Sequence, residues 1–199
     1  MNRAGGSAVS VLLITGTVGV GKTALAREVG ELLRRSGVAG AMIDLDALSY
    51  ASSGPVEDLF NSNLVLRNLK AIWPNYAARG VDHLVLARYV GAAEELDGYR
   101  DAIPSADLVV CRVTAPPETV QERLRRREVG LERDFLVALS QTLAVALDGG
   151  VVEDFVVENG PDRSITDVAE EVVKRMGWRV APSTAYGGVE GSESGSPAA

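Results

Sequence analysis

Short apolar runs and helix-like patterns alternate along residues 8–180. The apolar runs predict five strands, at residues 9–15, 41–45, 84–87, 108–113 and 155–157. Between and after them, apolar residues recur at helical spacing, which predicts helices at residues 23–36, 56–79, 92–102, 116–127, 134–147 and 164–176. Strands that alternate with helices are typical of a parallel sheet with helical crossovers. The pattern therefore predicts an α/β fold with a five-stranded parallel sheet between two layers of helices.

The two ends of the chain differ in composition from this central part. Residues 1–7 are mostly small and include glycine, so we expect a flexible N-terminus. Residues 181–199 are rich in glycine, serine and proline and offer almost nothing large to bury, which is typical of a disordered tail. We therefore expect one folded domain over residues 8–180.

Composition and charge disfavour several classes of partner. The chain of 199 residues is 46% hydrophobic and 24% charged, as is usual for one soluble domain. No apolar stretch approaches the roughly 20 residues that span a bilayer, and no secretory signal begins the chain. We therefore expect a cytoplasmic protein without membrane contact. The net charge of −7 disfavours nucleic acid as a partner, and the sequence leaves a homodimer open.

One motif indicates a specific chemistry. Residues 16–23 match the phosphate-binding loop pattern G-x-x-x-x-G-K-[ST] at every fixed position, and they follow a predicted strand and lead into a predicted helix. The glycines let backbone N–H groups point at phosphate oxygens. The lysine reaches the β and γ phosphates and the threonine hydroxyl ligates Mg²⁺. The motif predicts a nucleoside triphosphate and Mg²⁺ on these residues: Gly16, Thr17, Val18, Gly19, Val20, Gly21, Lys22 and Thr23.

A pair of acids follows the second predicted strand. Asp44 and Asp46 stand at alternate positions near the carboxyl end of that strand, which is where ligands bind in open parallel sheets. If the chain is still extended there, both carboxylates point to the same side. They can then address a ligand hydroxyl or the metal; the alternative is a helix cap or a solvent-facing side chain.

These features together resemble the P-loop small-molecule kinases, particularly adenylylsulfate kinase and chloramphenicol phosphotransferase, and more distantly shikimate and gluconate kinases. The resemblance rests on residues 16–23, on Ile-Asp-Leu-Asp at 43–46, and on Ala-Pro-Pro-Glu at 115–118 leading into Arg-Leu-Arg-Arg-Arg at 123–127. It implies a three-layer P-loop NTPase sandwich with a small helical lid at about residues 124–134. It also implies ATP as the nucleotide, with Asp46 as first choice for the base that contacts the acceptor hydroxyl and Asp44 as second.

The resemblance assigns roles to the arginine-rich segment and to a late loop. By analogy, Arg123 lies against the adenine, whereas Arg127 and Arg133 reach the transferring phosphate. Guanidinium groups suit this task because their N–H fork matches phosphate oxygens. The loop that contains Gly160 borders the adenine by the same analogy. The alternatives are a solvated helix face of interchangeable arginines and a plain connecting loop.

The third predicted strand departs from the usual pattern, because it ends in Arg88 and carries no carboxylate for the metal. Thr23 and Asp44 are therefore the expected metal ligands, with Asp46 or water as further sources. Arg88 and Arg100 offer positive charge where an acceptor would bind. That charge suggests an anionic or carbonyl-rich acceptor.

The function expected from these residues is transfer of the γ-phosphoryl group of Mg-ATP to a hydroxyl of an unidentified small molecule. The alternative is a nucleotide-binding ATPase or regulatory switch that acts on a protein partner. A GTPase is disfavoured because no N-K-x-D element occurs in the sequence. Acceptor-dependent release of ADP separates the kinase from the ATPase.

Overall fold

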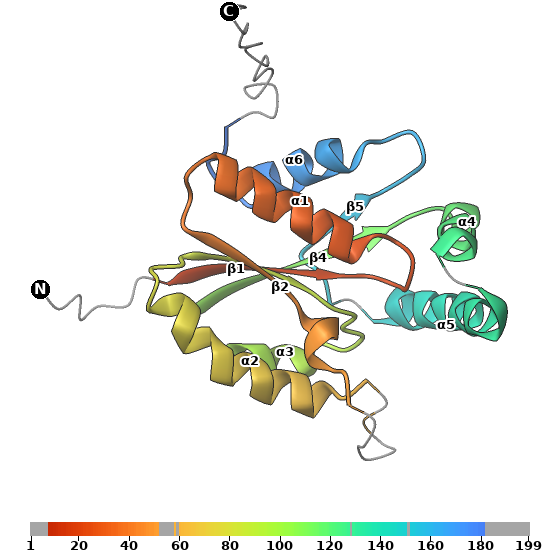
Figure 1. Cartoon of the computed structure of the whole chain (residues 1–199), viewed down its shortest axis with the longest axis horizontal. Coiled ribbons are helices and arrows are strands. Elements are labelled where there is room, and N and C mark those ends of the chain that lie inside the picture. Colours follow the sequence, from red (N-terminus) through yellow and green to blue (C-terminus); the bar gives the residue numbers. More distant parts are fainter. Residues whose placement is uncertain (1–7, 52–57, 59, 128, 151, 182–199) are drawn as a thin grey trace, which may run out of the picture.

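Five parallel strands form a single sheet. The computed structural model describes residues 8–51, 58, 60–127, 129–150 and 152–181. Its strand order is β2-β3-β1-β4-β5, and every neighbouring pair is parallel (Figure 1). The strands are β1 (Val9–Thr15), β2 (Gly40–Asp44), β3 (His83–Ala87), β4 (Ala106–Thr114) and β5 (Phe155–Glu158). The predicted fold class is confirmed.

Helices cover both faces of this sheet (Figure 1). One face carries α1 (Lys22–Arg35) and α6 (Ile165–Arg175), and the other carries α2 (Ser62–Ala77) and α3 (Glu95–Ala102). A short 3₁₀ helix, η1 (Leu45–Leu48), follows β2 directly. The remaining two helices, α4 (Pro117–Arg127) and α5 (Gly130–Gly149), lie beyond the carboxyl edge of the sheet.

The hydrophobic core has two halves, one on each face of the sheet. In β1, Leu12 and Ile14 pack with residues of α1 and α6, whereas Val11 and Leu13 pack with residues of α2 and α3. All four side chains are fully buried. Because both faces are covered, the strands are continuously apolar and do not alternate between apolar and polar residues. This burial explains why the apolar runs predicted the strands well.

Two helix predictions need correction. The second helix begins at Ser62 and not at residue 56, because the Asp58 carboxylate accepts the backbone N–H groups of Ser62 and Asn63 and ends the preceding loop. Pro74 lies inside this helix without breaking it. The helix predicted from residue 134 begins earlier, at Gly130. Part of the first prediction, residues 56, 57 and 59, lies outside the described residues.

The predicted lid, residues 124–134, includes the end of one helix and the start of the next. Residues 124–127 form the end of α4 and residues 130–134 form the start of α5, with Gly130 in a left-handed conformation at φ 65°. The predicted N-terminal segment and nearly all of the predicted tail, residues 1–7 and 182–199, lie outside the described residues. In the described part of the chain, no helix combines the length and the apolar character that crossing a membrane requires.

Candidate active site

The loop between β1 and α1 has a backbone that requires glycine. Gly16 and Gly21 have φ angles of 146° and 103°, in the region that other residues rarely adopt. A Cβ atom on Gly16 would lie 2.5 Å from the Val113 carbonyl oxygen, and one on Gly21 would lie 2.5 Å from Asn159 Nδ2. The loop is therefore packed against β4 and against the loop after β5. This packing leaves no room for a side chain at either fixed glycine of the motif.

Lys22, the first residue of α1, is buried at the centre of this loop. Its side chain is 8% exposed, and its Nζ donates hydrogen bonds of 3.0 Å to the carbonyl oxygens of Gly16 and Thr17. Burial lowers the pKa of Lys22 to about 8, while the negative charges of Asp46 and Asp44 act in the opposite direction. Lys22 is therefore still mostly charged at pH 7, and the negative charges of both acids stabilise its charged form.

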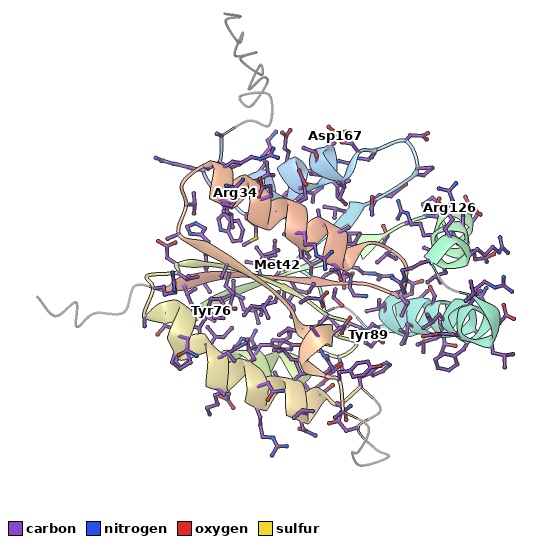
Figure 2. The ribbon with its side chains drawn as sticks, in the orientation of Figure 1. Arg34, Met42, Tyr76, Tyr89, Arg126 and Asp167 are labelled. Atoms are coloured by element: carbon purple, nitrogen blue, oxygen red, sulfur yellow. The ribbon has the colours of Figure 1, made fainter. Side chains whose placement is uncertain are left out.

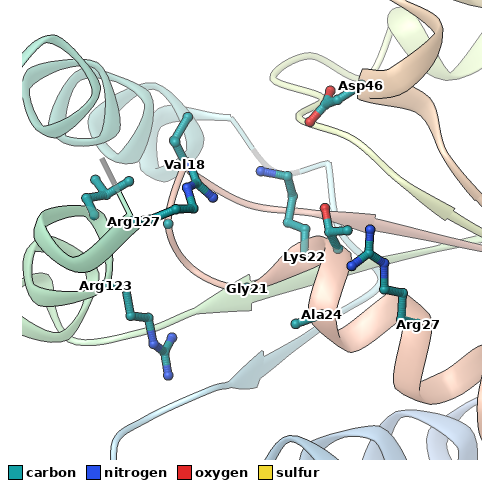
Figure 3. A pocket seen from close by; sticks show the side chains of 11 residues that line it. Val18, Gly21, Lys22, Ala24, Arg27, Asp46, Arg123 and Arg127 are labelled. Atoms are coloured by element: carbon teal, nitrogen blue, oxygen red, sulfur yellow. The ribbon is translucent and has the colours of Figure 1, made fainter. Parts of the chain in front are cut away.

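A cavity of about 440 Å³ opens beside Lys22. Figure 3 shows the Lys22 side chain pointing into this cavity, with Asp46 on the opposite side and Arg127 of α4 on a third side. The walls come from the loop, from α1, from η1 and from α4: Val18, Gly19, Gly21, Lys22, Thr23, Ala24, Arg27, Asp46, Arg123, Leu124 and Arg127. Most of the predicted loop residues and Asp46 therefore meet in one cavity with two of the predicted arginines.

The two acids of the predicted pair have different surroundings. The chain turns into η1 directly after Asp44, so the extended conformation that would align the two carboxylates ends there. Asp44 accepts the backbone N–H of Asp46 at 3.2 Å and thereby caps η1. Asp46 lines the cavity, whereas Asp44 is not among the residues that line it. Asp44 thus occupies the capping position that was the alternative to a ligand role, although its charge still acts on Lys22.

The three predicted arginines also separate. Arg127 and Arg123 line the cavity, and the positive charge of Arg127 further lowers the pKa of Lys22. Arg133 lies in the first turn of α5, where it forms an ion pair of 3.0 Å with Asp134. Arg133 is not among the residues that line the cavity. The cavity therefore receives its guanidinium groups from α4 and from α1, where Arg27 was not predicted.

Asn159 is a second residue that sequence reasoning missed. It is 5% exposed, and its Nδ2 donates a hydrogen bond of 2.7 Å to the Val20 carbonyl oxygen. Arg123 donates to the same oxygen at 3.2 Å and to the Asn159 carbonyl oxygen at 3.0 Å. Gly160, the predicted residue of this loop, is buried next to it but does not line the cavity. The available signal was an asparagine directly after an apolar strand.

No protein-family model and no curated protein matches this sequence. Solved structures do match it. The tunicamycin resistance protein of Deinococcus radiodurans is 19% identical, with a TM-score of 0.61 over 87% of this chain and 99% of its own. A sugar kinase from Janibacter sp. HTCC2649 is 18% identical, with a TM-score of 0.61 over 90% and 99% of the two chains. The APS kinase of Mycobacterium tuberculosis, in complex with AMPPNP and APS, is 22% identical, with a TM-score of 0.55 over 85% and 98%.

This chain has the fold of the P-loop small-molecule kinases. Within this P-loop kinase fold, β3 is followed by a buried cation. Arg88 is 3% exposed, and its Nη1 lies 3.5 Å from Asp46 Oδ1. Its Nη2 donates a hydrogen bond of 2.6 Å to the Phe60 carbonyl oxygen. The cation at the end of β3 therefore contacts the carboxylate that lines the cavity.

Proposed function

We propose that this protein transfers the γ-phosphoryl group of Mg-ATP to a hydroxyl group of a small molecule. One observation carries the proposal: a single cavity contains the phosphate-binding loop with Lys22, the Asp46 carboxylate opposite it, and Arg127. Phosphoryl transfer needs these three elements, because it depends on positioning and on stabilising charge on the moving group. The kinase fold of the neighbouring structures is consistent with this activity.

The loop supplies the binding site for the nucleotide phosphates. Backbone N–H groups of the loop and the N-terminus of α1 provide partial positive charge without a side chain. Lys22 would exchange its hydrogen bonds to Gly16 and Thr17 for phosphate oxygens. The pKa of Lys22, about 8, leaves it mostly charged at pH 7, and a bound phosphate raises that value further.

The residues present fit a magnesium ion. Thr23 and Asp46 both line the cavity and carry oxygen ligands, which Mg²⁺ prefers, usually together with several waters and phosphate oxygens. Thr23 would hold the ion directly, and Asp44 or Asp46 would hold it through water. The ion, when bound, supplies positive charge that offsets the negative charge on the β and γ phosphates.

Asp46 and Arg127 then act on the reacting groups. Asp46 orients the acceptor hydroxyl and accepts its proton, because it is the carboxylate opposite Lys22 in the cavity. Arg127 stabilises charge on the transferring phosphoryl group. Arg123 and Asn159 border the adenine side, where they hold the Val20 carbonyl oxygen. Arg133 would need to leave Asp134 to contribute, so we assign it no part in the step.

The test is the release of ADP from Mg-ATP, measured in a coupled assay against a panel of hydroxylated metabolites and antibiotics. We expect release to require one class of acceptor and the phosphorylated acceptor to appear in equal amount. Release that is equally fast without any acceptor would contradict the kinase proposal and would indicate an ATPase or a switch.

A further inference from the structure

A second cavity lies next to the nucleotide cavity. It has a volume of about 150 Å³, and Asp46 lines both cavities. Its walls come from η1, from the segment before α2 and from the residues after β3: Asp46, Ser49, Phe60, Asn61, Arg88 and Tyr89. Figure 2 shows Tyr89 at the carboxyl edge of the sheet, near η1. A molecule in this cavity would contact Asp46, the proposed base.

The charges of the second cavity are balanced. Arg88 lies 3.5 Å from Asp46, and both residues line this cavity. Arg100, which was expected to add a second cation, forms an exposed ion pair with Asp97 at 2.8 Å and does not line this cavity. The guanidinium of Arg88 is therefore already matched by the Asp46 carboxylate. An anionic acceptor would bring a further negative charge next to Asp46, so the expectation of an anionic acceptor loses its support.

The spacing of the Asp46–Arg88 pair suits two neighbouring oxygen atoms. The Asp46 carboxylate accepts a hydrogen bond, whereas the Arg88 guanidinium donates one. With hydrogen bonds of about 2.7–3.0 Å, two ligand oxygens placed side by side on Asp46 Oδ1 and Arg88 Nη1 lie roughly 3–5 Å apart. Hydroxyl groups on adjacent ring carbons lie at the short end of this range. One hydroxyl can then donate to Asp46 while its neighbour accepts from Arg88.

Two aromatic rings form the apolar part of this cavity. Phe60 and Tyr89 have ring centroids 5.7 Å apart and ring planes tilted by 45°. Flat aromatic faces beside a few directed polar groups are typical of a site for a small ring-shaped ligand. Phe60 is 38% exposed, so part of this residue is open to solvent.

We propose that the acceptor is a neutral ring with two neighbouring hydroxyl groups, as in a monosaccharide, a cyclitol or the ribose of a nucleoside. This inference rests on the proposed function. One hydroxyl binds Asp46 and the other binds Arg88, and the ring packs on Phe60 and Tyr89. The hydroxyl on Asp46 forms the new bond to the γ phosphorus, the bond from that phosphorus to the ADP oxygen breaks, and the hydroxyl proton passes to Asp46. Arg88 is thus a specificity residue.

The test compares binding and transfer for matched ligands. Ribose, glucose, myo-inositol and adenosine are each compared with an analogue that lacks one hydroxyl of a neighbouring pair, and 3-hydroxybutyrate represents hydroxy acids. Dissociation constants are measured by NMR titration of the protein with Mg-ADP, and ADP release from Mg-ATP is measured in parallel. We expect at least one diol to bind about 10- to 100-fold more tightly than its deoxy analogue, as is usual for a lost hydrogen bond to a charged group.

The variant Arg88→Lys should lose this preference for the diol, because an ammonium group lacks the planar guanidinium fork that fixes the second hydroxyl. Arg100→Lys is the matched control, and it should keep the preference. If Arg88→Lys does not fold, the comparison of diol and deoxy analogue on the native chain decides alone.

The outcomes separate this inference from the kinase proposal. Equal binding of diol and deoxy analogue, binding of 3-hydroxybutyrate alone, or no binding of any diol would show that the inference is wrong. Diol binding that depends on Arg88 but yields no phosphorylated product supports the acceptor site and contradicts the kinase proposal. Phosphoryl transfer to 3-hydroxybutyrate without diol binding supports the kinase and contradicts the diol.

Discussion

Replacing Lys22 with methionine should stabilise the protein while it removes phosphoryl transfer. The Lys22 side chain is 8% exposed, and burial lowers its pKa from 10.5 to about 8 although Asp46 and Asp44 act against this change. Since one pKa unit corresponds to 1.36 kcal/mol, the buried ammonium costs the folded protein roughly 3 kcal/mol at pH 7. Methionine keeps a side chain of similar length and carries no charge.

The gain is smaller than this cost, because Lys22 also donates hydrogen bonds to Gly16 and Thr17. Each such bond contributes about 0.5–1.5 kcal/mol, and part of the cost is therefore offset. We expect Lys22→Met to raise the free energy of unfolding by about 1 kcal/mol. For a chain of this size, that corresponds to a melting temperature higher by about 2–4 °C. Phosphoryl transfer should fall by about 10²–10³-fold or more, because the charge that stabilises the transferring oxygens is lost.

The pH dependence checks the origin of the effect. Between pH 8 and 10.5 the unfolded chain keeps the Lys22 proton while the folded protein loses it, so the stability of the native chain rises with pH in this range. The methionine variant lacks this rise, and the advantage of the variant should shrink above pH 8. Urea unfolding at pH 7, 8, 9 and 10 measures this, with Lys22→Arg as a variant that stays charged. A methionine variant that is less stable at pH 7, or an advantage that is independent of pH, would refute the reasoning.

Three further predictions concern the same cavity and the tail. Asp46→Asn should slow single-turnover transfer by about 10²–10⁴-fold with little change in ATP affinity. Asp44→Asn should show a defect in the transfer rate that changes with Mg²⁺ concentration. If both variants transfer phosphate at the parental rate, the two acids have only a structural role. Arg123→Ala should weaken ATP binding in a calorimetric titration, because Arg123 holds the Val20 carbonyl oxygen, whereas Arg125→Ala should not, because Arg125 is exposed and contacts Gln121. Equal affinities would show that the Arg123 contact is dispensable. Deleting residues 182–199 should leave the melting temperature unchanged, and a drop of several degrees would show that this segment docks.

Most of the fold and the centre of the site could be predicted because their signals are local. The loop motif occupies consecutive residues. Its glycines indicate backbone angles that other residues rarely adopt, as the φ of Gly21 shows. The strands were predictable because both faces of the sheet are covered, so burial leaves a continuous apolar run in the sequence.

The rest of the site depends on contacts between distant segments. Nothing in the sequence indicates that the chain turns into η1 after Asp44, so that Asp46 lines the cavity and Asp44 does not. Arg88 was seen as a positive charge, but its contact with Asp46 depends on how β2 and β3 lie side by side. Asn159 reaches Val20 across 139 residues of sequence, and no periodic pattern encodes such a contact.

The Val20 carbonyl oxygen joins three parts of the chain. It accepts hydrogen bonds from Arg123 and Asn159, which are 103 and 139 residues away in sequence. This part of the loop is therefore assembled only when the loop, α4 and the segment after β5 have all docked. A nucleotide that needs this assembled loop binds the folded state and not the unfolded chain, so it raises the free energy of unfolding by mass action. A bound nucleotide should therefore raise the melting temperature of the domain, although it touches only the loop and its neighbours.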